Sequence, residues 1–379
     1  MKKTKRIVSL LLMFLLAVGM TFATGCSKNE DPAKSVVVTV NDKDVYLDEV
    51  MYYVMAVEST GAEYDAAYLQ YTGTSYWDTK GDDGVTMSDQ AKQYVMDTAE
   101  MYTILYDKAV KAGYTLTDDE KTQAGTSADQ ILTSISEDQL AITGFTKESL
   151  TNVQEKLILA GRYYQDLIDG FDIDDAGIKA TIKRDDYKQY KTEYLFVPTT
   201  KYDESYNSVD LSEDEKATAK ASITAALDKV KAGEEFSKIT DADNTITTNT
   251  LNFILDDNTA EKEYQDAAVK LENDAYTPDI VETDTGYYII KMDDNNSTEA
   301  YDTAVDTAIS DAEQTAFKTE YDTMKKDYTL KINDKVWDPI VIGKTTIAAT
   351  DATGNAVTDN STADTTTGDA TTEDTATGE

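Results

Sequence analysis

Histidine is absent from all 379 residues, and this absence excludes more chemistry than any other feature of the composition. A Ser-His-Asp triad, a Cys-His pair, a histidine zinc site and a histidine general base all require the imidazole ring. The single cysteine, Cys26, likewise excludes a disulfide scaffold, a cysteine-rich zinc site and an iron–sulfur cluster. Any catalysis would therefore depend on carboxylates, hydroxyls, lysines and the 25 tyrosines.

Basic residues are also scarce, with 35 Lys and Arg against 72 Asp and Glu and a formal net charge of −37. A nucleic-acid partner requires a basic surface that displaces counterions, so no nucleic acid is expected. No glycine-rich motif that could cradle a phosphate is present, and no cofactor is expected. The length and the 40% of hydrophobic residues predict two ordinary domains.

The N-terminus has the order of a secretory signal. Four basic residues within positions 2–6 precede an apolar run at 7–23, and small residues lead to Cys26. The alternative is a transmembrane anchor, but the run is shorter than the ~20 apolar residues that span a bilayer. The pattern resembles the lipobox of bacterial lipoproteins, although Ala23 stands where leucine is usual. The resemblance implies a signal peptide at 1–25, lipidation of Cys26 and a linker at 26–35. Without the four basic residues, the charge of −37 becomes −41.

The C-terminal residues 345–379 consist mainly of Thr, Ala, Asp and Gly, without one basic residue. Such a composition cannot build a core, which predicts a disordered acidic tail.

Residues 36–190 have the pattern of a mainly helical domain. A β-hairpin at 36–47 is followed by a helix at 48–57, and a longer helix is expected at 88–112. Thr117 to Glu120 form a capping box, which predicts a helix start, and an apolar stripe runs from Leu150 to Ile168.

The pattern changes at Lys191. A strand at 191–197, a capping box from Ser212 to Glu215, and further strands near 251–254 and 286–292 alternate with short helices. Residues 191–297 are therefore predicted to form a small α+β domain, and the whole chain to be of the α+β class. A helix at 299–326 and a strand at 328–332 follow; the strand could pair with the N-terminal hairpin, so that 299–335 packs back onto the helical domain.

Four segments carry a family resemblance: KTEYLFV, KAGEEFSKI, YQDAAVKL and GYYIIKM. In this order they resemble the parvulin-type (rotamase, PpiC-like) peptidyl-prolyl isomerase domain. The preceding VVVTVNDKDVYLDEV, AVKAGYTLTDDE and GFTKESLTNVQEKLIL resemble the helical chaperone segment of PrsA-like foldase lipoproteins and SurA-like chaperones. The resemblance covers roughly residues 36–332.

The resemblance also shows where the family's chemistry is missing. Tyr194 and Tyr288 stand where active parvulins have histidines, and Asp241 corresponds loosely to an acid or cysteine of the family. The resemblance implies a degenerate catalytic set of these three residues and a prolyl pocket lined by Leu251, Phe253, Tyr264 and Val269. The alternative is that both tyrosines are core or half-buried strand residues. Oxygen-rich turns at 256–258 and 293–296 lack the spacing of a calcium loop, so no metal is expected.

Taken together, these features predict an exported, membrane-anchored foldase or chaperone for unfolded or secreted polypeptides, held by a lipid on Cys26 at the outer face of the bacterial cytoplasmic membrane. Its parvulin-like domain would have weak or lost isomerase activity, so the sequence leaves open whether it is an enzyme. One alternative is an active peptidyl-prolyl isomerase. Another is a structural or adhesive surface lipoprotein.

Overall fold

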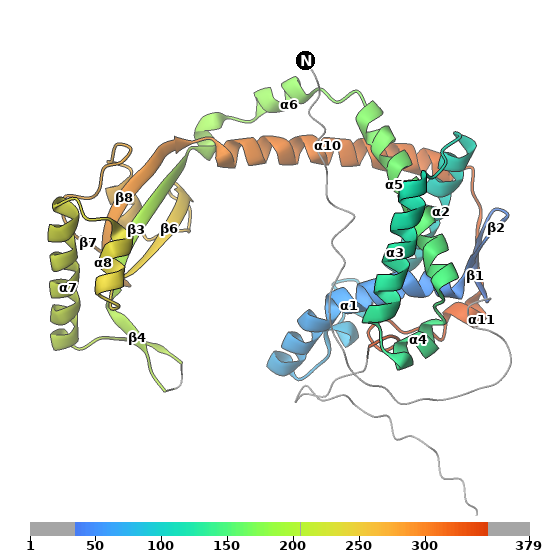
Figure 1. Cartoon of the computed structure of the whole chain (residues 1–379), viewed down its shortest axis with the longest axis horizontal. Coiled ribbons are helices and arrows are strands. Elements are labelled where there is room, and N and C mark those ends of the chain that lie inside the picture. The colour runs from blue at the N-terminus through green and yellow to red at the C-terminus, as the bar shows by residue number, and fades with distance from the viewer. Residues whose placement is uncertain (1–34, 205, 348–379) are drawn as a thin grey trace, which may run out of the picture. The chain divides into compact units, whose positions relative to one another are not determined.

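The structure is a computed structural model that describes residues 35–204 and 206–347. It divides into two compact units (Figure 1). Unit 1 holds the chain up to Gly170 and again from Phe317, and unit 2 holds Phe171–Ala316. The sequence places the boundary between the domains at residue 190, whereas the structure places it at Gly170.

Three predicted segments lie outside the described residues, wholly or in part. They are the signal peptide at 1–25, the linker except for Ser35, and residues 348–379 of the tail.

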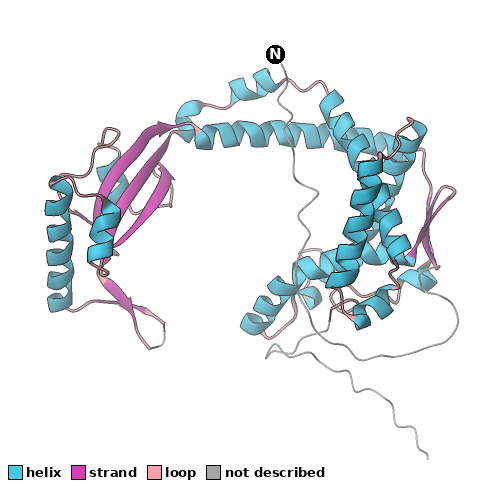
Figure 2. Cartoon of the chain, in the orientation of Figure 1, coloured by secondary structure: helices cyan, strands magenta, loops and turns pink. Residues whose placement is uncertain are grey.

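Unit 1 is built mainly from helices, as Figure 2 shows. Its elements are β1 (Val36–Val40), β2 (Lys43–Tyr46), α1 (Leu47–Thr72), η2 (Tyr76–Asp78), α2 (Met87–Lys111), α3 (Asp118–Ser134), α4 (Glu137–Thr143), α5 (Lys147–Gly170), β9 (Leu330–Ile332) and α11 (Asp334–Trp337). The end of α10 (Glu299–Lys325) also belongs to this unit. The helix expected at 48–57 is longer than predicted, because α1 continues to Thr72.

The small sheet of unit 1 joins the two ends of the described chain. β1 pairs with β2 in a hairpin and with β9 on its other side, both antiparallel. The register sets Val38 opposite Ile332. The predicted pairing of the C-terminal strand with the N-terminal hairpin is therefore confirmed.

Local sequence signals fix the helix ends of both units. The capping boxes predicted at Thr117 and Ser212 both form, because each hydroxyl accepts from the backbone N–H three residues on, and the glutamate there accepts in return. Gly113 and Gly233 follow the ends of α2 and α7 with positive φ, a conformation that stops the helix.

Residues 338–346 pack onto unit 1 beyond its last helix. Thr346 is buried, and Thr345 and Thr346 donate hydrogen bonds to the buried carboxylate of Glu58 on α1. Thr345 and Thr346, which were predicted to belong to a disordered tail, are therefore part of the fold of unit 1.

Unit 2 consists of a four-stranded sheet with flanking helices and a separate hairpin. Its elements are α6 (Asp175–Thr181), η3 (Arg184–Tyr187), β3 (Gln189–Pro198), β4 (Thr200–Tyr202), β5 (Ser208–Asp210), α7 (Glu213–Lys231), α8 (Phe236–Ala242), β6 (Thr247–Ile254), α9 (Lys262–Ala268), β7 (Val281–Glu282) and β8 (Gly286–Ser297), followed by the first turns of α10. The sheet has the order β6-β3-β8-β7 with every neighbouring pair antiparallel.

The two faces of this sheet carry separate cores, because successive side chains of a strand point to opposite faces. On one face Leu195, Val197 and Ile289 pack with α7 and α8 (Figure 1). On the other face Tyr190, Ile290 and other strand residues pack with α9. The second face carries the candidate site.

Candidate functional site

Three tyrosine rings meet on the sheet face that α9 covers. Tyr194 comes from the central strand β3, Tyr288 from its neighbour β8, and Tyr264 from α9. The ring centroids of Tyr194 and Tyr288 lie 5.3 Å apart, and Tyr264 lies 5.9 Å from Tyr194 and 5.1 Å from Tyr288. All three pairs are edge-to-face, the geometry that aromatic quadrupoles favour. The structure thus brings together Tyr194 and Tyr288, two of the three residues of the predicted catalytic set.

The tyrosines line an open pocket of about 310 Å³. Four predicted site residues contribute to its wall: Tyr194, Leu251, Tyr264 and Tyr288. Five further residues complete it that the sequence did not indicate: Asn258, Thr259, Ala260, Glu261 and Thr285. These five lie in the loops at the ends of β6 and β8 and at the start of α9, where strand patterns give no signal.

The other predicted residues lie elsewhere. Phe253 is buried beneath the pocket and stacks on Tyr190 at 5.3 Å, and Val269 packs in the same core without lining the pocket. Asp241 is exposed on α8, whose buried residues belong to the core of the opposite sheet face. The fold therefore separates Asp241 from the two tyrosines. Cys26 lies outside the described residues.

The hydroxyl of Tyr264 is already committed inside the domain. It lies 2.8 Å from the hydroxyl of Thr192, which itself donates to the carbonyl of Leu251 at 2.8 Å. The Thr192 hydroxyl has one proton, which it donates to the carbonyl of Leu251. Tyr264 is therefore the donor in the hydrogen bond between Tyr264 and Thr192. Burial raises the pKa of Tyr264 well above its ordinary value. Tyr264 therefore serves the pocket with its ring and not with its hydroxyl.

The hydroxyl of Tyr288 keeps its proton at neutral pH. Burial raises its pKa, and the negative charge of Glu261 adds to the rise, although a hydrogen bond with Thr285 opposes it. Glu261 in turn accepts from the backbone N–H of Thr285 at 3.1 Å and from its hydroxyl at 3.0 Å. Tyr288 is therefore a neutral hydrogen-bond donor at the pocket wall.

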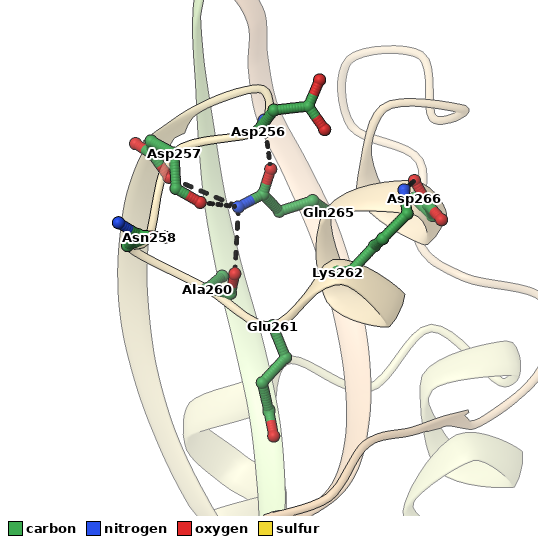
Figure 3. Close-up of a pocket in the computed structure, with 8 residues that line it drawn as sticks. All are labelled: Asp256, Asp257, Asn258, Ala260, Glu261, Lys262, Gln265 and Asp266. Carbon is green, nitrogen blue, oxygen red and sulfur yellow. Dashed lines mark hydrogen bonds and ion pairs between the residues drawn. The ribbon is translucent and has the colours of Figure 1, made fainter.

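A second cavity of about 390 Å³ adjoins the tyrosine pocket and shares Asn258, Ala260 and Glu261 with it. Figure 3 shows the buried amide of Gln265 at its centre, bonded to the loop that precedes α9. The amide oxygen accepts from the N–H of Asp256 at 2.7 Å, and the amide nitrogen donates to the carbonyls of Asp257 and Ala260 at 2.8 and 3.0 Å. Gln265 therefore fixes the loop that forms the wall between the two cavities.

In residues 35–204 and 206–347, no group of three or more His, Cys, Asp or Glu side chains could hold a metal ion. None of the helices that the structure describes is both long and apolar enough to cross a membrane.

The arrangement can bind and desolvate a peptide but offers little for proton transfer. Rotation about a peptide bond must cross a barrier of ~18–20 kcal/mol, and it requires no nucleophile. An aromatic pocket can lower the barrier by removing water from the amide, and a neutral donor such as Tyr288 can bond to it. No histidine is available as a general base.

Comparison with known families gives this domain a class. Residues 200–294 match the family model of the rotamase or PPIC-type PPIase domain. The matched segment contains α7, α8, β6, α9 and nearly all of β8, and with them Tyr264 and Tyr288. The chain thus carries a parvulin-type domain, and the resemblance predicted from the sequence is confirmed.

Several solved structures are similar to the chain. The foldase protein PrsA of Lactococcus lactis is 15% identical, with a TM-score of 0.31 over 80% of this chain and 97% of that one. A second similar structure comes from a study of PEB4 and Cj1289, two structurally related SurA-like chaperones of Campylobacter jejuni. It is 10% identical with a TM-score of 0.30, and the match covers 79% of this chain and 99% of that chain. PrsA of Bacillus subtilis is 17% identical, with a TM-score of 0.23 over 63% of this chain and 91% of that one. No protein with a curated description matches the sequence.

Proposed function

We propose that the protein is an exported foldase or chaperone that binds unfolded segments of secreted proteins, and that its isomerase activity is weak or lost. The observation that carries this proposal is the pocket of Tyr194, Tyr264 and Tyr288 on the parvulin-type domain. The pocket keeps aromatic walls that suit a prolyl ring. It has no histidine, and one of its three hydroxyls is committed to Thr192.

The helical unit supplies a further surface for unfolded chains. Tyr64, Tyr71 and Tyr94 are 57%, 93% and 63% exposed. Tyrosine has a large apolar ring and a polar tip, so it can hold varied sequences without a defined partner shape. The formal charge of −37 keeps the protein soluble and favours basic clients.

The proposal includes a membrane anchor. The basic, apolar and small-residue order that ends at Cys26 favours export and lipidation, with the folded units at the outer face of the bacterial cytoplasmic membrane. A lipid would then hold a protein whose net charge is repelled by anionic membranes.

Two assays on one protein preparation test the proposal. The chain from residue 27 onward is added to a protein whose refolding is limited by proline isomerisation. In a separate assay, it is added to a protein that aggregates on dilution from denaturant. We expect suppression of aggregation with little acceleration of refolding. Tyr194→Ala should weaken the binding of a proline-containing peptide, whereas Tyr202→Ala should not, because Tyr202 is 76% exposed on the β4–β5 hairpin. Fast refolding without suppression of aggregation would favour an active isomerase. If the protein neither suppresses aggregation nor accelerates refolding, the proposal is contradicted.

A further inference from the structure

Glu261 places a carboxylate in the wall of the tyrosine pocket. It is the N-cap residue of α9, is half-buried and lines both the tyrosine pocket and the adjoining cavity. Its two oxygens accept from the backbone N–H and the hydroxyl of Thr285, the residue that precedes β8. These bonds hold the carboxylate beside the ring of Tyr288, which also lines the pocket.

No cation of the described residues neutralises this carboxylate. None of the ion pairs within 4.0 Å in the described part of the chain includes Glu261. The adjacent Lys262 is directed to Asp266, with 2.9 Å between the ammonium nitrogen and the carboxylate oxygen, and Figure 3 shows the two side chains together. In Figure 3 the carboxylate of Glu261 points away from both. The tyrosine pocket therefore carries one negative charge that its own domain leaves unpaired.

The loop that carries Glu261 is held before any ligand binds. Gln265 bonds to the loop backbone at Asp256, Asp257 and Ala260. The carboxylate of Asp257 accepts from the N–H groups of Ile254 and Thr259, each at 2.9 Å, so its oxygens stabilise the loop backbone. A charge on a fixed wall discriminates between ligands more sharply than one on a mobile chain, because little ordering is needed on binding.

We propose that Glu261 is a specificity-determining residue that makes the pocket prefer prolyl segments with Lys or Arg next to the proline. This inference rests on the proposed function of the pocket as a prolyl-segment site. A prolyl ring would lie among the tyrosines, and a neighbouring ammonium or guanidinium group would approach the Glu261 carboxylate and the aromatic faces. An acidic neighbour would be repelled by the same charge, which adds discrimination against the wrong ligand.

The test uses three fluorescein-labelled peptides that differ only in the residue before a single proline: Lys, Ala or Glu. A second set varies the residue after the proline. Binding to the chain from residue 27 is measured by anisotropy at low and at high salt. We expect the Lys peptide of at least one set to bind about five- to tenfold more tightly than its Glu counterpart at low salt, with the difference shrinking as salt screens the charges.

Glu261→Gln should remove most of this preference and leave the Ala peptide within about twofold of wild type. The matched control is Asp228→Asn, which removes one negative charge from an exposed position of α7 on the opposite side of the sheet. This control should keep the preference, because a screened charge remote from the pocket contributes little.

The outcomes separate this inference from the proposed function. If all peptides bind equally in both sets, or if Glu261→Gln weakens every peptide by the same factor, Glu261 does not set specificity, although the prolyl pocket stands. If no proline peptide binds while the fold is intact by circular dichroism, the pocket is not a prolyl site and both proposals fail.

Discussion

The carboxylate of Glu58 accepts hydrogen bonds from both the backbone N–H and the hydroxyl of Thr346, a residue 288 positions further along the chain. The same carboxylate accepts from the N–H groups of Gly343 and Thr345 at 2.6 and 3.0 Å. Glu58 is fully buried on α1. One side chain therefore holds four donors of the C-terminal segment against the first helix of unit 1.

Replacing Glu58 by alanine should destabilise unit 1 by about 3 kcal/mol, because four donors lose their acceptor and part of the segment must stay buried. Urea unfolding of the full chain, followed by tryptophan fluorescence, measures the effect. Glu63→Ala on the exposed side of the same helix is the matched control and should change stability by less than about 0.5 kcal/mol. Equal effects of the two variants would contradict a specific role for Glu58.

The pH dependence of stability should carry the signature of Glu58. Burial raises its pKa above the ordinary glutamate value, although its hydrogen bonds with Thr346, Thr345 and Gly343 oppose the rise. A carboxyl with a raised pKa binds a proton more tightly in the folded state, so its stabilising contribution is complete below its unfolded pKa and is lost as pH rises through its folded pKa. The stability of wild type relative to Glu58→Gln should therefore fall between about pH 4 and neutrality. If the stability of wild type relative to Glu58→Gln instead rises with pH, the pKa of Glu58 in the folded state is lowered.

Gly343 should tolerate no side chain. Its φ is +92°, and a Cβ added there would lie 2.3 Å from a ring carbon of the buried Trp77. We expect Gly343→Ala to cost about 2 to 4 kcal/mol, because strain in the backbone adds to overpacking of the core. Gly73 separates the two effects: it has φ +74° but nothing within 4 Å, so Gly73→Ala should cost only about 1 kcal/mol. Thermal unfolding of both variants makes the comparison.

Local sequence signals predicted much of the fold. The capping boxes at Thr117 and Ser212 depend on residues three positions apart, and both were visible in the sequence. The end of the fold was not predictable in the same way. Thr346 lies in a Thr-rich segment whose composition indicates disorder, and its acceptor Glu58 is charged within an apolar helix pattern. Only the tertiary structure shows that the two residues satisfy each other.

In the candidate site, too, some positions could be predicted from local sequence patterns and others depend on the tertiary structure. Strand alternation sets Tyr194 and Tyr288 on one sheet face, so their approach follows from the pattern once the strands pair. The place of Glu261 depends on a loop whose shape is set by Gln265, and no short-range signal predicts that shape. Asp241 was assigned by alignment to the family, but α8 packs on the other face of the sheet.

Lipidation of Cys26 predicts a change of cell fraction. Wild-type protein should sediment with the membranes, because a lipidated and processed chain is held by its acyl groups. Cys26→Ser should remain unprocessed or appear in the medium. Lys28→Ala, two residues further along, is the control and should leave the distribution unchanged. Wild type that fractionates as the cysteine variant does would contradict the anchor.

Isomerase activity on a short proline peptide should be weak, and its rate should vary little between about pH 6 and 9. The chain has no histidine to titrate in this range, and burial raises the pKa of both Tyr264 and Tyr288 above the ordinary tyrosine value of ~10. Tyr288→Phe removes one hydroxyl donor and should lower any residual rate by no more than about tenfold, the equivalent of one hydrogen bond. Tyr264→Phe should instead leave the residual rate nearly unchanged and reduce stability by about 1 kcal/mol, because it breaks the bond to Thr192 inside the core. A bell-shaped rate profile centred near neutrality, or a rate equal to that of an active parvulin, would show that the pocket has a catalytic acid or base that these tyrosines do not provide.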